Sequence, residues 1–321
     1  MADLEDRLAS SVGKLDGLTQ EMEGLRQSLH ASSLEIKQEK LYSTLFFQNL
    51  PLEYTLSAQS GRWLEEFKGR HDIRFSFHEG IHRQDIMYLH AFLTKGDSHF
   101  AYMSYMGIGW NGFQVVRTVL QSANGDVGVK GRILDFASGY GRVSRFLAGY
   151  YGPERVCVSD IKADAVDYMV ERMGVSGFHS VEDPALLDVE DRFEVIFVGS
   201  LFSHLNQDLC RKWLEKLVSL TEPEGLLVFS THDISLHKQG SDEGHVFWEQ
   251  NEDGAFHFID NQITATDKYG TSFTSEAFIE GQLHSIDPSL RYVRYPKFFG
   301  GLQDVYVVTK AGRLPAPGLR H

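Results

Sequence analysis

Two histidines and a glutamate stand at a zinc-binding spacing in the stretch FSFHEGIHRQD, residues 75 to 85. His78, Glu79 and His82 follow the order H-E-x-x-H, in which both histidines bind the metal and the glutamate polarises a water molecule. That chemistry needs one continuous helix through both histidines and a third ligand beyond it. Here Gly80 separates the histidines and the preceding IRFSF alternates like a strand. We therefore expect no metal site and no peptidase.

The helix is expected to begin after this motif, around RQDIMYLHAF. The stretch then becomes a candidate wall of a substrate pocket, and two of its residues, Arg83 and Asp85, are candidate substrate contacts. Trp110, an aromatic residue farther along, is a third candidate, although aromatic residues of this kind more often belong to a core.

A second group of residues can bind a nucleotide-like ligand. The segment GRILDFASGYGRVSRFL, residues 131 to 147, passes from an apolar strand through a glycine turn into an amphipathic helix. Gly139 and Gly141 allow a ligand to approach the backbone closely. Asp160 ends the next apolar run, RVCVSDI, where a carboxylate can accept both hydroxyls of a ribose.

Two features argue against a dinucleotide at this turn. Ser144 occupies the place of the third glycine that close packing around a pyrophosphate normally requires. Asp135 puts a negative charge beside the turn, which repels a pyrophosphate but suits a cationic ligand. A dehydrogenase that binds NAD is therefore a weaker alternative.

The elements that position these residues follow a regular order. Short apolar runs alternate with amphipathic stretches from residue 131 onward, which predicts a parallel sheet covered by helices on both faces. Strands are predicted at 131–136, 155–159, 177–181, 193–198, 225–231, 290–296 and 303–309, with helices starting near 140, 162, 206 and 274. The interval 232–273 breaks this rhythm, and we interpret it as an insertion over the end of the sheet.

The N-terminal part has a different pattern. Leucines and other apolar residues repeat at alternating three- and four-residue steps over the first forty residues, which predicts a coiled coil that joins copies of the chain. The range 41–130 is rich in aromatic residues, with helices expected near 56–68, 83–95 and 110–123, and is interpreted as a helical cap that contacts substrate. Residues 313–321 are expected to form a flexible tail.

The motifs together resemble those of class I S-adenosylmethionine-dependent methyltransferases. The resemblance lies in Asp135, Gly139 and Gly141, in Asp160, in FVGSLFSHL after the fourth strand, in EPEGLLVFSTHD and in the closing QDVYVVTK. It covers about residues 130 to 310 and implies a Rossmann-like α/β fold with a seven-stranded, mostly parallel sheet. The methyltransferase domain is then expected over 131–312. Two positions depart from the family pattern, because Ala137 and Glu224 stand where glycine is common.

The resemblance also implies roles for particular residues. S-adenosyl-L-methionine is the expected cofactor, and backbone groups near 180–183 are expected to border its adenine. The expected cofactor contacts are Asp135, Ala137, Gly139, Gly141, Asp160, Ile161, Asp183 and Gly199.

Methyl transfer to a hydroxyl also needs a general base, and histidine is the usual side chain near neutral pH. His204 and His232 follow the fourth and fifth strands, on the ligand-facing end of the sheet, and Asp233 shares that rim as a candidate substrate contact. GSLFSHL, YGTSFTSEAF and QDVYVV resemble small-molecule methyltransferases of bacterial glycan and secondary-metabolite pathways. The expected activity is O-methylation of a small polar or sugar-like acceptor. A coiled-coil assembly protein that binds the cofactor without methylating remains an alternative.

Composition limits the possible partners. The 321 residues include 44 acidic and 31 basic side chains, and the net charge of −13 disfavours binding to nucleic acid. Two cysteines in no paired spacing fit a reducing compartment. No apolar run reaches the roughly 20 residues of a membrane span, and the N-terminus does not read as a signal sequence. The sequence therefore predicts a cytoplasmic protein that forms homo-oligomers.

Overall fold

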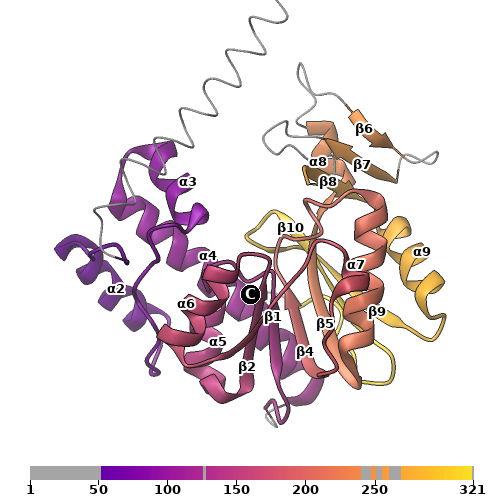
Figure 1. The fold of residues 1–321 in the computed structure, drawn as a ribbon, viewed down its shortest axis with the longest axis horizontal. Helices are drawn as coiled ribbons and strands as arrows, with labels where there is room; N and C mark the ends of the chain where they lie inside the picture. Colours follow the sequence, from indigo (N-terminus) through magenta and orange to yellow (C-terminus); the bar gives the residue numbers. More distant parts are fainter. Residues whose placement is uncertain (1–51, 126–127, 240–246, 251–254, 260–268, 320–321) are drawn as a thin grey trace, which may run out of the picture. The chain divides into compact units, whose positions relative to one another are not determined.

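The computed structural model describes residues 52–125, 128–239, 247–250, 255–259 and 269–319. In this part of the chain, three helices precede an alternation of strands and helices (Figure 1). The helices are α2 (Ala58–Arg70), α3 (Ile86–Lys95), α4 (Ser98–Asn124), α5 (Ser144–Tyr151), α6 (Ala163–Met173), α7 (Gln207–Leu220), α8 (Ile234–Gln239) and α9 (Glu276–Ile286). The predicted coiled coil, 1–40, lies outside the described residues.

The strands form one mixed sheet. They are β1 (Ile133–Phe136), β2 (Val156–Asp160), β3 (Ser176–His179), β4 (Phe193–Val198), β5 (Thr221–Asp233), β6 (Phe247–Gln250), β7 (Phe256–Ile259), β8 (Thr271–Thr274), β9 (Arg291–Phe299) and β10 (Gln303–Thr309). The order β3-β2-β1-β4-β5 is parallel throughout, and β10 and β9 then continue the sheet in antiparallel pairing. The expected α/β fold is confirmed, because all seven predicted strands are present in a mostly parallel sheet.

The interval 232–273 contains more regular structure than an insertion without a clear period suggests. Its described residues include α8, the hairpin β6–β7 and most of β8, and β8 pairs in parallel with the last two residues of β5, His232 and Asp233. The sheet therefore has ten strands in the described chain rather than seven. The sequence pattern missed the added strands because each is only four residues long.

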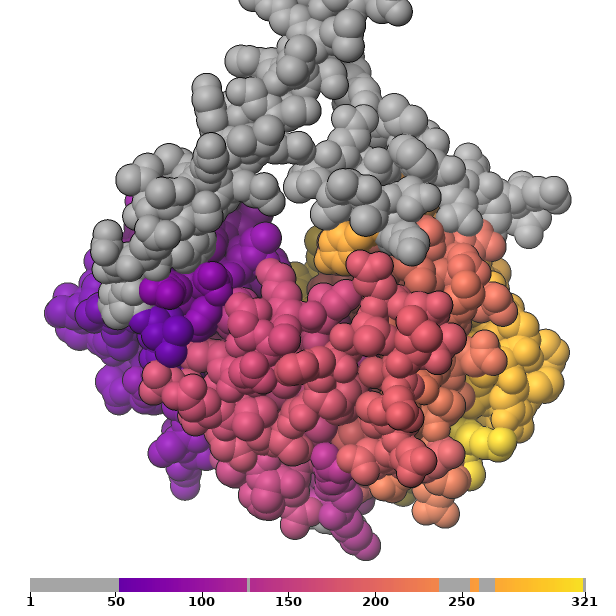
Figure 2. All heavy atoms as spheres, viewed as in Figure 1, coloured from indigo at the N-terminus to yellow at the C-terminus, as the bar shows by residue number. Residues whose placement is uncertain are grey.

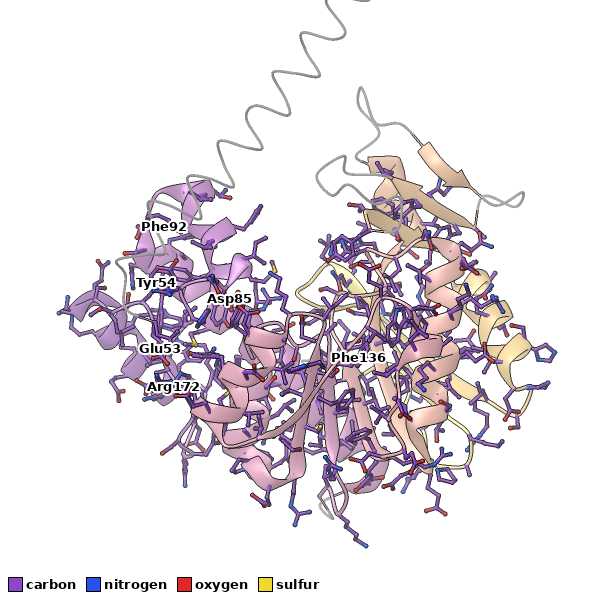
Figure 3. All side chains as sticks on the ribbon, in the orientation of Figure 1. Glu53, Tyr54, Asp85, Phe92, Phe136 and Arg172 are labelled. Atoms are coloured by element: carbon purple, nitrogen blue, oxygen red, sulfur yellow. The ribbon has the colours of Figure 1, made fainter. Side chains whose placement is uncertain are left out.

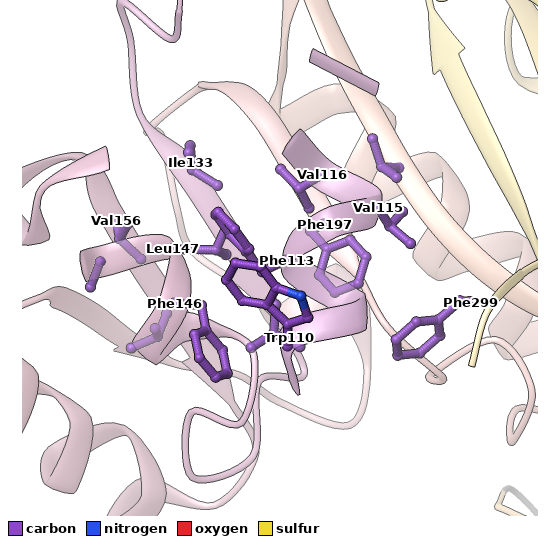
Figure 4. Packing of buried hydrophobic residues seen from close by; sticks show 14 of the residues in the cluster. Trp110, Phe113, Val115, Val116, Ile133, Phe146, Leu147, Val156, Phe197 and Phe299 are labelled. Atoms are coloured by element: carbon purple, nitrogen blue, oxygen red, sulfur yellow. The ribbon is translucent and has the colours of Figure 1, made fainter. Parts of the chain in front are cut away.

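Both faces of the sheet are covered by helices. Alternate residues of one strand enter opposite cores: Ile133 joins the core under α4, α5 and α6, whereas Leu134 joins the core under α7 and α9. Figure 4 shows the first core, where aromatic side chains of α4 and α5 meet Phe197 of the sheet. This double layer explains why the central strands are apolar on both sides.

Helices α2 and α3 lie near their predicted positions, whereas α4 begins much earlier than predicted, and side chains define the starts of α3 and α4. Asp85 caps α3 by accepting from Met87 N at 2.9 Å. Asp97 caps α4 by accepting from the backbone nitrogens of His99 and Phe100. Helix α4 therefore begins at Ser98, twelve residues before the start predicted at 110. Figure 2 shows the atoms of this cap, in violet, directly beside those of the strand-and-helix part that follows, in pink.

Helix α4 lies so close to the glycine turn that glycine is required at their contact. A Cβ added at Gly109 would lie 2.1 Å from the carbonyl oxygen of Arg142, whereas one added at Gly107 meets nothing within 4 Å. We expect Gly109→Ala to lower the free energy of unfolding by about 2 kcal/mol, the usual scale of overpacking. Gly107→Ala, its control on the same helix, should raise it by about 0.5–1 kcal/mol through helix propensity.

Urea unfolding of the two variants tests this contact directly. If Gly109→Ala were as stable as Gly107→Ala, α4 would not press against the turn as described.

The HEGIH segment is irregular rather than helical, and α3 begins after it at Ile86. Ile81 accepts a bond from Tyr54 N at 2.9 Å, and His82 forms an isolated bridge with Glu53. The preceding IRFSF is not a strand in the structure, so its alternation of apolar and polar residues was misleading. The helical geometry that an H-E-x-x-H zinc site requires is therefore not formed by these residues.

The C-terminal segment makes specific contacts within the part of it that is described. Ala316 accepts from Tyr295 Oη at 2.7 Å, and its backbone nitrogen donates to Ser122 Oγ at 2.8 Å. The described residues of the predicted flexible tail, 313–319, are thus hydrogen-bonded to β9 and α4 through Ala316. Among the described residues, no helix is both long and apolar enough to cross a membrane.

Candidate functional site

The turn after β1 has the backbone conformation that its glycines allow. Gly139 and Gly141 have φ angles of +56° and +79°, and Ala137 has +57°. A Cβ added at Gly139 would meet no atom within 4 Å, so space lies open above its Cα. The left-handed conformation of Ala137 gives the physical reason why glycine is favoured at that position. At Gly141, by contrast, an added Cβ would lie 2.7 Å from Met173 and 2.8 Å from Met169, so that glycine packs against α6 and only Gly139 offers an open backbone surface to a ligand.

Asp160 joins the end of β2 to this turn. Its Oδ2 accepts from Gly139 N at 2.7 Å and its Oδ1 from Lys162 N at 3.0 Å, and the residue is 9% exposed. Each carboxylate oxygen can accept a second hydrogen bond. The side chain that we expect to bind a ribose is thus held in place by the same backbone that would face the rest of the nucleoside.

Asp135 is buried under the turn. It is 3% exposed, and its Oδ2 accepts from Ser144 Oγ at 2.5 Å. Burial raises the pKa of this carboxyl to about 7; the bond from Ser144 lowers it, and the negative charge of Asp160 raises it further. Ser144, which stands where a third glycine is missing, therefore stabilises the turn through the hydrogen bond that its side chain donates to Asp135.

The raised pKa of Asp135 gives a pH dependence of stability. The folded protein holds this proton up to about pH 7 and the unfolded chain releases it near its ordinary value of 3.8, so stability falls as pH rises between these values. We expect the free energy of unfolding of the wild type to decline by about 1.4 kcal/mol per pH unit relative to Asp135→Asn in this window. Urea unfolding of both proteins at pH 4.5, 5.5 and 6.5 measures the difference. Parallel curves would contradict the buried, protonated Asp135.

The other expected cofactor residues lie around the same edge of the sheet. Ile161 follows Asp160 and is 55% exposed, which leaves an apolar surface beside the carboxylate. Asp183 is exposed and caps a short 3-10 helix by accepting from Ala185 N at 3.1 Å. Gly199 follows β4, where an added Cβ would lie 3.1 Å from the ring of Phe197. The open backbone of Gly139, the Asp160 carboxylate and the Ile161 surface together fit a nucleoside.

The two candidate bases lie at the carboxyl edge and affect each other. His204 Nδ1 is 2.7 Å from Gly270 O, and its ring stacks on Tyr269 with centroids 5.0 Å apart. His232 is the last residue but one of β5 and packs against Phe273. Burial lowers the pKa of both, although the Gly270 carbonyl opposes this for His204, and the nearby His204 lowers that of His232 further. Both rings are therefore neutral at pH 7 and suited to accept a proton.

The candidate substrate residues have structural partners. Asp85 is 3% exposed and accepts from Tyr105 Oη at 2.6 Å in addition to capping α3. Trp110 is 6% exposed and lies among Phe113 and Phe146 in the first core (Figure 4). Asp233 accepts from Arg294 Nη2 at 2.7 Å.

The structure does not group the candidate substrate residues with the two histidines. The exception is Asp233, which follows His232 in the chain. The fourth, Arg83, accepts through its carbonyl from Tyr54 Oη at 2.8 Å.

The side chains of HEGIH point to separate partners. His78 Nε2 lies 3.1 Å from Glu53 Oε1 and 2.9 Å from Tyr168 Oη, and Glu53 also approaches Arg172 at 3.8 Å (Figure 3). Glu79 pairs with Lys68 at 2.5 Å. The ring of His82 stacks on Tyr140, the residue between the two glycines of the turn, with centroids 4.4 Å apart. The segment therefore connects the cap to the turn.

Arg145 makes this connection firm, and sequence reasoning missed it. Its guanidinium is 1% exposed and donates to five acceptors: the carbonyls of His78, Gly80, Tyr140 and Gly141 and the hydroxyl of Tyr105. The one available signal was an arginine at a position of an amphipathic helix that is otherwise apolar, between Ser144 and Phe146. Such a cation is expected to be buried with several acceptors.

Residues 133–225 match the family model described as "Methyltransferase domain", which covers the turn, Asp160 and His204. No curated protein matches the chain.

The solved structures that it resembles include an S-adenosylmethionine-dependent methyltransferase from Clostridium acetobutylicum, at 13% identity and a TM-score of 0.45 over 64% of this chain and 92% of that one. They also include the CcbJ methyltransferase from Streptomyces caelestis (18%, 0.44, 64% and 90%) and DesVI from Streptomyces venezuelae (13%, 0.46, 70% and 98%). The family match, together with the turn and its carboxylate, carries the assignment. Residues 133–225, which carry the turn and its carboxylate, therefore match a methyltransferase domain, and they lie in the Rossmann-like α/β sheet described above.

Proposed function

We propose that this protein transfers the methyl group of S-adenosylmethionine to an oxygen of a small polar or sugar-like acceptor, in a glycan or secondary-metabolite pathway. The observation that carries the proposal is the pair of neutral histidines, His204 and His232, at the carboxyl edge of the sheet, the same edge that carries the glycine turn after β1. A hydroxyl must lose its proton during methylation, and a neutral imidazole at this edge can accept it.

The residues of the chain have distinct tasks in this reaction. When bound, S-adenosylmethionine supplies an activated methyl group, so the protein has mainly to align the acceptor and exclude water. Gly139 and Asp160 hold the nucleoside part, and Asp135, whose pKa is raised to about 7 by burial, supports the turn without placing a full charge beside it. A histidine of the pair receives the proton of the acceptor.

Methyl transfer is tested with S-adenosylmethionine labelled in its methyl group. The full chain is incubated with two pools, one of sugars, glycosides and phenols and one of primary and secondary amines. The proposal expects label in the hydroxyl pool and its loss in Asp160→Ala. Label in the amine pool alone would replace O-methylation by N-methylation, the activity for which one structural neighbour, a glycopeptide N-methyltransferase, is named.

The two alternatives give different results. A dehydrogenase would bind NADH in preference to S-adenosylhomocysteine, and the Ser144 side chain bonded to Asp135 argues against the pyrophosphate. A non-catalytic assembly protein would bind S-adenosylhomocysteine but transfer no label to any pool. Self-association through residues 1–40 and residence in the cytoplasm also remain proposals, and sedimentation of the full chain beside a chain starting at residue 41 tests the first.

A further inference from the structure

A hydrogen-bond chain links the ends of three strands behind His232. Ser200 follows β4, Ser230 lies in β5 and Gln303 begins β10. Ser200 N donates to Ser230 Oγ at 2.8 Å, and the hydroxyls of Ser230 and Ser200 lie 2.6 and 3.2 Å from Gln303 Oε1. At the other end of its amide, Gln303 Nε2 lies 3.3 Å from His232 Nε2. No motif in the sequence indicates this chain, because its members are 30 to 103 positions apart.

The distances define the direction of each bond. A separation of 2.6 Å is ordinary for a hydroxyl donating to a carbonyl oxygen but short for an amide N–H donating to a hydroxyl. The atom of Gln303 that faces Ser230 is therefore its oxygen, and the NH2 group faces His232. An amide NH2 can only donate, so the Nε2 of His232 accepts and carries no proton.

The other ring nitrogen of His232 must then hold the proton. Nδ1 is buried and makes no hydrogen bond of good geometry within the described chain. The backbone of Ser272 nevertheless raises the pKa of the ring, as a carbonyl oxygen near an N–H does. In His204, by contrast, the proton on Nδ1 is donated to the carbonyl of Gly270 at 2.7 Å, which leaves Nε2 as the basic nitrogen.

We propose that Gln303 is a positioning residue that holds His232 as the Nδ1–H tautomer with its Nε2 lone pair occupied, so that His204, through Nε2, is the base of the pair. The assignment of His204 as the base rests on the proposed O-methylation, whereas the assignment of the two tautomers is independent of it. His232 then stays neutral beside His204. The positive charge that His204 gains with the proton disfavours a second positive charge on His232. Titratable groups that face the pair from neighbouring elements include Tyr269, which stacks on His204.

The tautomers are measured by NMR on the full chain labelled with 15N at histidine. Long-range 1H–15N correlation spectra at pH 7.5 distinguish protonated from unprotonated ring nitrogens, and His204→Ala and His232→Ala assign the signals. We expect both rings to be Nδ1–H tautomers. In Gln303→Met the Nε2 of His232 loses its donor, and we expect that ring to gain the Nε2–H form while His204 is unchanged. Gln121→Met, the same change at an exposed position of α4, should leave both rings as in the wild type.

The proposal is overturned if His232 is Nε2–H or doubly protonated in the wild type, if Gln303→Met leaves its tautomer unchanged, or if His204 is Nε2–H. These readings need no acceptor, so they are independent of the labelled-methyl assay. Once that assay has given an acceptor, His204→Ala should lower the transfer rate at pH 7.5 at least 100-fold, whereas His232→Ala should lower it less than 10-fold. The reverse order would overturn the choice of base with the O-methylation intact.

Discussion

Replacing Asp160 by asparagine should weaken binding of S-adenosylhomocysteine about 100-fold. The carboxylate already accepts from Gly139 N and Lys162 N, and each oxygen retains capacity for a ribose hydroxyl. Hydrogen bonds to a charged group contribute about 1.5–3 kcal/mol each, and asparagine loses the charge and one acceptor oxygen. A loss of about 3 kcal/mol corresponds to the expected change in Kd. Isothermal titration calorimetry of the ligand-free proteins measures it.

The control for this variant is Asp167→Asn, seven residues farther along the chain. Asp167 lies in α6, and its largely exposed carboxylate is paired with His179. Asp167→Asn therefore removes one negative charge, as Asp160→Asn does, but from a side chain that does not contact the turn. Its Kd should equal that of the wild type within twofold. Binding by Asp160→Asn within threefold of the wild type would mean that the carboxylate at the end of β2 does not hold the ribose.

Replacing Arg145 by methionine should cost about 3–5 kcal/mol of folding stability. The apolar stem of methionine fits the buried space, but the carbonyls of His78 and Gly80 lose the guanidinium that donates to them, and the carbonyl of Gly141 keeps only the backbone nitrogen of residue 145. A buried acceptor without a partner costs about 1–3 kcal/mol. Tyr105 also loses the guanidinium, which donates to its hydroxyl and lies 5.0 Å from its ring centroid. Urea denaturation gives the change in the free energy of unfolding.

The control is Arg142→Met, three residues earlier in the turn that precedes α5. Arg142 is partly exposed and makes none of these bonds through its side chain in the described chain, so its replacement should cost less than about 1 kcal/mol. Because Arg145 also holds the carbonyls of Tyr140 and Gly141, we expect Arg145→Met to bind S-adenosylhomocysteine more weakly than Arg142→Met does. Equal stability of the two variants would contradict the role of Arg145 as the link between cap and turn.

The link through Arg145 changes the meaning of HEGIH. The sequence shows a metal-binding spacing, but the structure uses the backbone carbonyls of His78 and Gly80 as acceptors and the ring of His82 as a stacking partner of Tyr140. The segment is therefore a contact between the cap and the cofactor turn. Within the described residues no group of three or more His, Cys, Asp or Glu side chains is arranged to hold a metal ion.

Much of the fold was determined by local sequence alone. Strands β1, β2 and β4 are apolar on both faces, and a buried parallel strand requires that pattern wherever it lies in the sheet. Asp160 and the turn at Gly139 and Gly141 were found because one strand end and one tight turn are encoded within a few residues. The caps Asp85 and Asp97 are local in the same sense.

Tertiary structure alone decided which side chains meet at the site. Arg145 bonds to a carbonyl 67 positions away, and Gln303 reaches His232 across 71 positions. Trp110, an aromatic candidate for the pocket, was drawn into the core because its apolar area is better buried against α5 than left at the rim. Periodicity and spacing record the conformation of neighbours in the chain, whereas hydrogen-bond partners depend on how the strands and helices pack. The sequence therefore determined seven strands of the sheet and the cofactor turn, and the packing determined the added strands and the partners of the two histidines.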